Sequence, residues 1–270
     1  MKHISIPLLI IICFSLSSCF RDRIDLELNK NDNVRLAVEA WISDLDERQS
    51  VLLSLTSDFL GNFEPRFIDD AKVTLSYDAE LIELVFIGNG EYAAPENWRA
   101  LTDKEYMLDI EYENDHYISS SFMSAMPELE NIRSEFYETR DSIDYYDVFF
   151  GFQETPGIGD GYYGVDYRKG TSDGDTLIIG GFTNDDFGDG VFYSDITVTN
   201  EGYEIGDTII LDVFSIGAEA SNYLQDVINE VFREGVFDPP PVNPRSNISN
   251  GALGYFITSG AGRYEYVVKE

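Results

Sequence analysis

The chain has 270 residues, of which 50 are acidic and 18 are Lys or Arg, so its formal net charge is −32. Nucleic-acid binding requires clustered basic side chains, and this charge excludes a nucleic-acid partner. An anionic bilayer surface is an equally poor partner for the bulk of the chain. Hydrophobic residues make up 43% of the sequence, which is enough apolar surface to build folded cores and excludes a disordered protein.

The N-terminal segment has the features of an export signal. Lys2 gives a positive start, and Ile4–Leu16 is an almost uninterrupted apolar run that is too short to cross a bilayer as a helix. The run ends in Leu16-Ser17-Ser18-Cys19, which resembles the lipobox of bacterial lipoproteins, where a signal peptidase cuts before a lipidated cysteine. We therefore predict a signal peptide over residues 1–18 and lipidation at Cys19. A plain secretory signal, or a short membrane-active helix, with an incidental cysteine is the alternative.

Processing at this position changes which reactive groups the mature chain retains. Lys2, His3 and Cys13 would be lost, and Cys19 would be acylated. No thiol would then remain for a disulfide, a zinc site or a nucleophile. His116 would be the only histidine, which excludes His-rich metal sites and leaves one imidazole base.

The first region after the signal predicts a β-sandwich. Residues 19–33 are polar and charged, and we expect a tether between the lipid and the first strand. Apolar residues then alternate from Val34 to Ile42, with Glu39 and Trp41 on the opposite face. Further short strands are expected at 51–55, 71–77, 81–87, 106–112 and 116–122. Strands separated by turns every 8–12 residues or so indicate a β-sandwich domain over residues 34–127.

The second region is also rich in predicted strands. The charged stretch 128–144 predicts a connector with some helix, and residues 145–270 predict a second β-rich domain. Apolar residues at helical spacing predict one amphipathic helix near the C-terminus, over residues 218–233 and ended by Gly235. Its strands are expected at 145–152, 162–167, 177–182, 191–193, 208–214, 253–258 and 264–268. The expected fold class is therefore mainly β.

The candidates for catalysis are weak. A serine hydrolase needs a nucleophile, a base and an orienting acid. His116 is the only base, it directly follows a predicted Asn114-Asp115 turn, and no Gly-x-Ser-x-Gly elbow accompanies it, so we expect an exposed histidine. Gly157-Ile158-Gly159-Asp160-Gly161 lacks the Lys-Ser/Thr of a phosphate-binding loop and the helix that would follow. Carboxylate pairs for glycoside hydrolysis are certain to occur among fifty acids, and a solvated acidic surface predicts the same pairs.

Calcium is the better chemical hypothesis. Asp173-Gly174-Asp175 and the segment Asn184–Gly190 place carboxylates on glycine-rich loops, which suits a cation that prefers six to eight oxygen ligands. The EF-hand spacing fails, because the third position counted from Asp185 is Phe187. Turn geometry and solubility explain the same residues, so no metal ligand is assigned.

Paired aromatic residues offer a second kind of site. Tyr145-Tyr146, Phe149-Phe150, Tyr162-Tyr163 and Trp98 are candidates for stacking platforms that contact sugars or a partner protein. Adjacent residues in a strand point to opposite faces, and core packing is therefore favoured for most of them.

Several stretches together resemble one known family. They are Leu36–Asp44, Met126-Pro127, Asn184–Gly190, Gly206-Asp207-Thr208, Phe214-Ser215-Ile216, the helical Tyr223-Leu224 and, most specifically, Ser246–Phe256. In this order they resemble Bacteroidetes lipoproteins known only as domain of unknown function 4249. Ala40 departs from the glycine usual there, and residues 162–167 match loosely. The resemblance implies an outer-membrane lipoprotein with an immunoglobulin- or transthyretin-like N-terminal module, often encoded beside TonB-dependent receptors, and it brings no catalytic residues.

These features favour a non-enzymatic, lipid-anchored accessory or binding protein of the outer membrane that works with a TonB-dependent transporter. An extracytoplasmic glycan hydrolase that uses Asp/Glu pairs is one alternative, and a calcium-stabilised structural or adhesive surface module is another. We expect no cofactor and assign no catalytic, cofactor-binding or metal-binding residue. The ligand, a small molecule or a glycan, stays open. Arg21-Asp22-Arg23 mixes charges after the lipidated cysteine, so the cell-surface and periplasmic faces also both stay open.

Overall fold

The first strand follows the alternation of the sequence. In the computed structural model of the protein, β1 (Leu36–Ser43) buries every second residue from Leu36 to Ile42 and turns Glu39 and Trp41 outward. The same period of two produces the strands that follow it: β2 (Ser50–Leu55), β3 (Arg66–Phe67), β4 (Lys72–Tyr77), β5 (Glu80–Gly88), β6 (Glu91–Ala93), β7 (Lys104–Tyr112) and β8 (Asp115–Met123). The predicted strands of this region are confirmed.

The structure describes residues 34–57, 66–156, 190–198, 202–233 and 242–270, together with the backbone of 162–171 and 174–183. The predicted signal peptide, Cys19 and the tether 19–33 lie outside the described residues. So do the loop residues 157–161, Asp173, 184–189 and Gly235.

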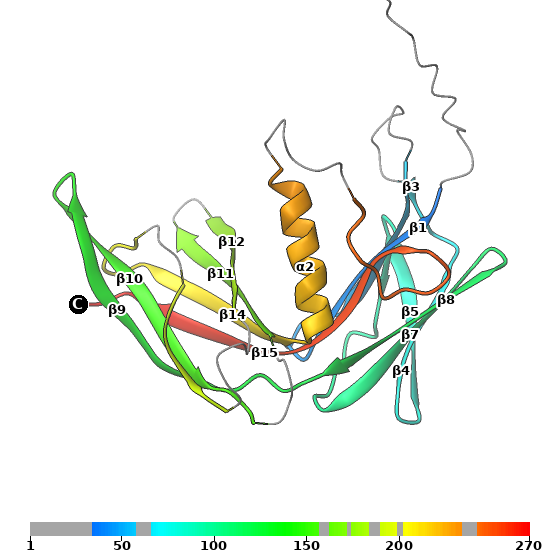
Figure 1. The fold of residues 1–270 in the computed structure, drawn as a ribbon, viewed down its shortest axis with the longest axis horizontal. Helices are drawn as coiled ribbons and strands as arrows, with labels where there is room; N and C mark the ends of the chain where they lie inside the picture. The colour runs from blue at the N-terminus through cyan, green and yellow to red at the C-terminus, as the bar shows by residue number, and fades with distance from the viewer. Residues whose placement is uncertain are drawn as a thin grey trace, which may run out of the picture. The chain divides into compact units, whose positions relative to one another are not determined.

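The later part of the chain adds more strands and one helix. They are β9 (Leu129–Arg140), β10 (Ile143–Gln153), β11 (Tyr162–Thr171), β12 (Gly174–Thr183), β13 (Phe192–Thr197), β14 (Thr208–Ile216), α2 (Ala218–Val231) and β15 (Leu253–Val267). Across the described residues the fold is therefore mainly β, and α2 is the helix near the C-terminus that the sequence predicts (Figure 1). Among the described residues, no helix has the length and apolar character needed to span a bilayer.

Most strands belong to one large sheet in the order β12-β11-β14-β15-β1-β2-β6-β5-β4-β7-β8, with β3 beside β2. The sheet curls back on itself, because β8 also contacts β15. The backbone N–H of Thr258 donates to Ser121 Oγ at 3.1 Å, and that of Gly260 donates to the carbonyl oxygen of Ser124 at 2.9 Å. The result is sandwich-like, with the inner face of one curled sheet enclosing a core.

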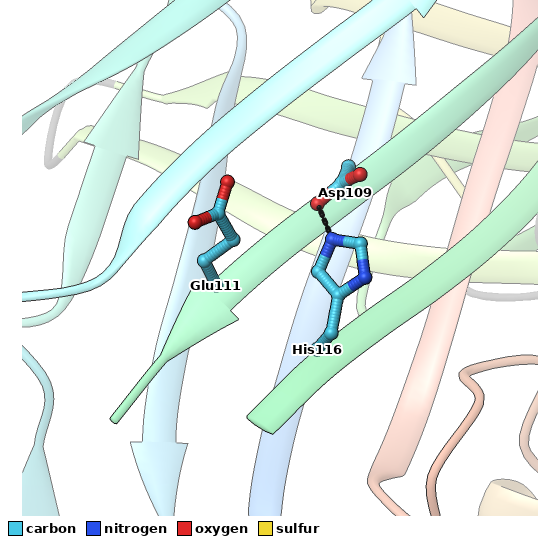
Figure 2. Close-up of side chains that lie close together, drawn as sticks. All are labelled: Asp109, Glu111 and His116. Atoms are coloured by element: carbon cyan, nitrogen blue, oxygen red, sulfur yellow. Dashed lines mark hydrogen bonds and ion pairs between the residues drawn. The ribbon is translucent and has the colours of Figure 1, made fainter. Parts of the chain in front are cut away.

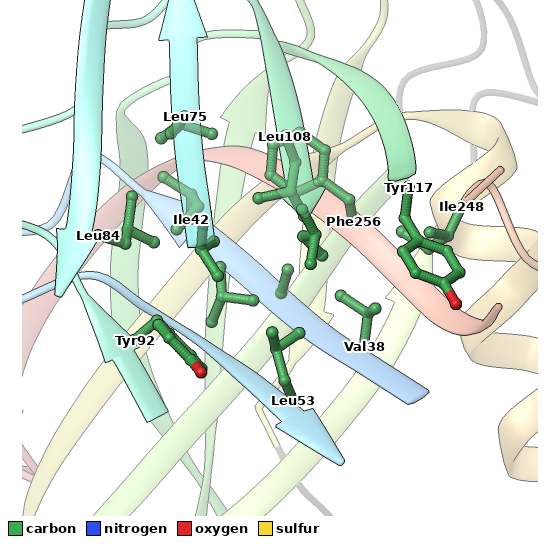
Figure 3. Close-up of a cluster of buried hydrophobic side chains, with 14 of the residues drawn as sticks. Val38, Ile42, Leu53, Leu75, Leu84, Tyr92, Leu108, Tyr117, Ile248 and Phe256 are labelled. Carbon is green, nitrogen blue, oxygen red and sulfur yellow. The ribbon is translucent and has the colours of Figure 1, made fainter. Parts of the chain in front are cut away.

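That core is assembled from nearly every strand of the curled part (Figure 3). Val38, Leu53, Leu75 and Leu108 come from β1, β2, β4 and β7, and Phe256 of β15 lies among them; each is at most 1% exposed. Burying an aliphatic side chain of this size stabilises the fold by about 1.5–3 kcal/mol. Strands far apart in the sequence are therefore held together mainly by this shared core.

A second core lies against the other half of β15. It joins the three-stranded sheet β13-β10-β9 to β14 through Tyr146, Val148 and Phe150 on one side and Ile209 and Leu211 on the other. Tyr146 and Phe150 are buried, whereas Tyr145 and Phe149 are not. The preference for core packing is thus confirmed for one member of each pair. The side chains of 162–163 lie outside the described residues.

Residues 128–144 are not a partly helical connector. β9 occupies most of this stretch and pairs antiparallel with β10, from Ile143↔Arg140 to Phe152↔Leu129. The expectation was wrong because the apolar residues of β9 do not alternate. Two irregularities interrupt its register with β10, and a charged strand that pairs along only one edge can expose most of its side chains.

β15 links the two predicted regions within one sheet. Residues Ala37 to Ser43 of β1 pair in parallel with the first half of β15, from Leu253 to Ser259. The second half, from Gly260 to Val267, pairs antiparallel with β14. Residues Val34–Glu270 accordingly cluster as one compact unit.

Candidate functional site

A groove opens between α2 and the outer face of the large sheet. Its volume is about 450 Å³, which is within the range of small-molecule sites. β1 contributes Glu39 and Trp41, and α2 contributes Tyr223 and Leu224. Figure 1 shows α2 lying beside β1 and β15. The remaining lining residues are Ala40, Ser50, Leu52, Glu91, Tyr255 and Ile257.

The strand register explains why these side chains meet. Tyr255 lies opposite Glu39, Glu39 opposite Leu52, and Leu52 opposite Glu91, so the four form one row across β15, β1, β2 and β6. Adjacent strands are about 4.8 Å apart, which places the Cα atoms of Glu39 and Glu91 about 10 Å apart with Leu52 between them. Because alternate residues of β1 fill the core, the outer row is free to form a site.

Aromatic rings define one side of the groove. Trp41 Nε1 donates to Ser259 Oγ at 2.8 Å, and the Trp41 ring contacts Phe214 edge-on with 5.3 Å between centroids. Tyr223 of α2 stacks on Tyr255 of β15 at 4.8 Å with an interplanar angle of 24°. These contacts fix the rings on regular elements, and 38% of the Trp41 surface stays exposed for a ligand.

The charged groups of the groove are all acidic. Glu91 Oε1 accepts a hydrogen bond from Ser50 Oγ at 2.7 Å. Burial raises the pKa of the Tyr223 hydroxyl, and the negative charge of Glu39 adds to this effect. No Lys, Arg or His lines the groove, and neither glutamate has an ion pair within the part of the chain that the structure describes.

A helix-side contact holds the groove wall in place. Arg245 Nε and Nη2 donate to the two carboxylate oxygens of Asp226 at 2.7 and 3.2 Å. The backbone N–H of Arg245 also donates to this carboxylate, at 3.1 Å. These bonds lower the pKa of Asp226 and tie α2 to the segment that leads into β15.

A second cluster lies on the outer face of β7 and β8 (Figure 2). One side-chain ligand atom from each of Asp109, Glu111 and His116 lies within 4.8 Å of the other two. His116 Nε2 is 2.6 Å from Asp109 Oδ1, and Lys72 Nζ is 2.6 Å from Glu111 Oε1. The hydrogen bond between Lys72 and Glu111 raises the pKa of the lysine and lowers that of the glutamate.

One imidazole and two carboxylates are ligand types that suit Zn²⁺. Each group already has a partner, however, and the side chains of His116 and Glu111 are 52% and 55% exposed. The exposure of His116 agrees with its position after a turn. The arrangement therefore works as a polar network on the sheet surface.

The family model described as Domain of unknown function (DUF4249) matches residues 21–265. The chain belongs to this family. A search of the curated proteins finds no match.

The DUF4249 match includes every residue of the groove. It also includes the segment Ser246–Phe256, whose role the structure explains. The Asn247 side chain pairs with the backbone of Phe256, Ile248 and Ala252 join the core, and Gly254 passes close to β1. In this DUF4249 chain the segment therefore brings β15 against β1 and places Tyr255 in the groove.

The other sequence candidates are distributed over the fold. Trp98 packs against Tyr106 with 6.5 Å between centroids and does not line the groove. Gly174 begins β12 at a hairpin end, and the N–H of Gly190 donates to the buried Glu154 carboxylate.

The groove is not predictable from local sequence pattern. The alternation places Glu39 and Trp41 on the outer face of the first strand, but nothing local connects them with Glu91, Tyr223 or Tyr255. The usable signal was the pairing of an acid with a tryptophan at outward positions of a strand, where solvated side chains are the rule.

Proposed function

We propose that this protein is a non-enzymatic, lipid-anchored binding protein of the outer membrane that assists a TonB-dependent transporter. The observation that carries the binding role is the groove beneath α2, where aromatic rings and two carboxylates converge on a concave surface. Concave apolar sites with a few fixed polar groups are the usual form of ligand sites.

Rigid elements support this role. Trp41, Leu52 and Glu91 come from three neighbouring strands, and Tyr223 comes from the helix. A ligand would meet side chains whose positions are already set by the core beneath and by the Tyr223–Tyr255 stack. Binding then costs little ordering of the protein.

The anchoring part of the proposal rests on the Leu16–Cys19 lipobox and on the resemblance of the chain to lipoproteins. An acyl chain on Cys19 would hold the protein at the membrane, and the segment 19–33 would set how far the folded part reaches. Incorporation of labelled palmitate into the wild-type chain, and its loss in Cys19→Ala, tests the anchor. Labelling of both chains would contradict it.

The partner is tested separately. Tagged protein recovered from solubilised outer membranes should bring a TonB-dependent transporter with it, and the Trp41→Ala/Tyr223→Ala double variant should recover less. Protease treatment of intact cells distinguishes the cell-surface from the periplasmic orientation. Recovery of the tagged protein without any transporter would refute the partner claim.

Glycan hydrolysis remains a second candidate, because Glu39 and Glu91 face the same groove. Glycosidases place two carboxyl groups about 5–9.5 Å apart across the scissile bond. Hydrolysis of any member of a polysaccharide panel, abolished by Glu39→Gln or Glu91→Gln, would establish this activity in place of binding alone. The calcium module is the third proposal. A rise in melting temperature with calcium, reversed by chelator, would support it.

A further inference from the structure

We propose that the groove binds an organic cation, a guanidinium or primary ammonium group on a short apolar stem. The inference rests on the proposed binding function and names the class of ligand. It follows from one juxtaposition: Glu39 and Glu91 lie on either side of Leu52, next to the rings of Trp41 and Tyr223.

The first argument is charge. Acids outnumber Lys and Arg by 50 to 18, so an acid without a basic neighbour is common in this chain. The two groove glutamates differ from an ordinary surface acid in their neighbours, because Leu52 lies between them and the rings of Trp41 and Tyr223 line the same groove. Both carboxylates carry the same charge on one concave surface, and a cation placed between them is attracted by both.

The second argument is the aromatic surface. Guanidinium and ammonium groups bind favourably over the face of Trp or Tyr rings within about 6 Å of the centroid. This chain already makes such contacts with its own arginines, since Arg133 lies 5.1 Å from the Phe149 centroid and Arg140 lies 4.9 Å from that of Tyr145. Trp41 and Tyr223 offer the same kind of surface to a ligand.

The third argument is what the groove disfavours. An anion would meet two negative charges and no positive group among the described lining residues. A bare Ca²⁺ ion requires six to eight oxygens at about 2.3–2.6 Å, whereas these two carboxylates stand on strands separated by a third. An elongated cation can contact a glutamate with its charged end and lay its stem on Leu52.

Two kinds of molecule carry such a cation, a free small molecule and a partner protein with an Arg or Lys side chain. Titration calorimetry of the full-length protein in detergent, with agmatine as the free guanidinium, tests the first source. A short peptide with one arginine, compared with the same peptide carrying citrulline, tests the second. We expect saturable binding of agmatine or of the arginine peptide, and no binding of the neutral citrulline peptide.

Variants locate the site. Glu39→Gln/Glu91→Gln should weaken cation binding at least about 10-fold, and Trp41→Leu should weaken it at low and high salt alike. The matched control Glu83→Gln/Glu105→Gln removes the same charge from the exposed outer face of β5 and β7 and should bind as the wild type does. Melting temperatures of all variants identify any loss of folding.

The outcomes separate this inference from the proposed function. Equal weakening in both double variants would mean that overall charge, and not the groove, attracts the cation, and would overturn the inference. Binding of a neutral sugar that survives Glu39→Gln/Glu91→Gln, together with no binding of agmatine or arginine peptide, would overturn the inference and leave the binding function standing. Absence of all binding, with unchanged transporter recovery in the Trp41→Ala/Tyr223→Ala variant, would overturn both.

Discussion

The side-chain amide of Asn247 hydrogen-bonds both backbone groups of Phe256. Its Nδ2 donates to the Phe256 carbonyl oxygen at 2.9 Å, and its Oδ1 accepts from the Phe256 N–H at 2.8 Å. The amide thus replaces one residue of a neighbouring strand, at a position where the Phe256 side chain is fully buried. A single side chain therefore satisfies backbone groups that would otherwise lack partners in the first half of β15.

Replacing Asn247 should destabilise the protein. Asn247→Ala removes both hydrogen bonds next to a buried residue, and we expect the free energy of unfolding to fall by about 2 kcal/mol. Denaturation in urea measures this free energy of unfolding. Asn229→Ala, on the exposed side of α2, is the matched control and should leave the midpoint unchanged. Equal stability of Asn247→Ala and wild type would show that water replaces the Asn247 side chain as hydrogen-bond partner of the Phe256 backbone.

Gly254 allows β15 to approach β1. Its φ is +90°, and a Cβ atom there would overlap the carbonyl oxygen of Val38. Gly251 has a similar φ of +74° but open space around it. Gly251→Ala should therefore cost only the left-handed backbone strain, about 1–2 kcal/mol. Gly254→Ala should cost clearly more and reduce the yield of folded protein, as measured by chemical denaturation and soluble expression. Similar losses in the two variants would contradict the steric explanation.

A buried carboxylate depends on Arg263. Asp212 is 2% exposed and accepts two hydrogen bonds from Arg263, at 2.6 and 2.7 Å, which raise the pKa of the guanidinium. Arg263→Met would leave that charge unpaired, and we expect a loss of about 3 kcal/mol, at the low end for buried pairs because Arg263 is partly exposed. Arg245→Met breaks a comparable pair with Asp226 at the surface and should change thermal stability little. Equal melting temperatures of Arg263→Met and Arg245→Met would contradict the prediction.

Asp147 should make stability depend on pH. Burial raises its pKa, and within the described residues its Oδ1 has no hydrogen-bond partner. A carboxyl group whose pKa is raised by folding holds its proton more tightly in the native state, so its contribution to stability is lost as pH rises through the folded pKa. Asp147→Asn should therefore be more stable than wild type at pH 7, and the difference should shrink towards about pH 4, near the unfolded pKa of Asp. Melting curves at several pH values test this, with the exposed Asp69→Asn as control. A difference in melting temperature between Asp147→Asn and wild type that does not vary with pH would contradict this role of Asp147.

Local sequence pattern predicts single strands and helices better than it predicts which strands pair with one another. The alternation from Leu36 to Ile42 and the helical spacing within 218–231 depend only on residues close in sequence, and both were confirmed. β9 was missed because an irregular edge strand does not require alternation. The parallel pairing of Ala40 with Phe256 joins positions more than two hundred residues apart, and no periodicity encodes it.

The candidate site was harder to predict for the same reason. Glu39, Glu91 and Tyr223 meet only after three strands take their register and the helix packs on Tyr255. His116 was easier, because a turn next to a short strand already implies solvent exposure. Residues that act through one local element are readable from sequence, and residues that act through long-range register are not.

The position of β15 also constrains how the protein is made. β1 is synthesised early, yet one of its edges and the Phe256 part of its core stay open until residues 253–259 arrive. A chain that stops before residue 253 would display a bare strand edge and an unfilled core, both of which favour aggregation and proteolysis. Synthesis of the C-terminal strand is thus the step at which the chain closes its core and becomes resistant to proteolysis.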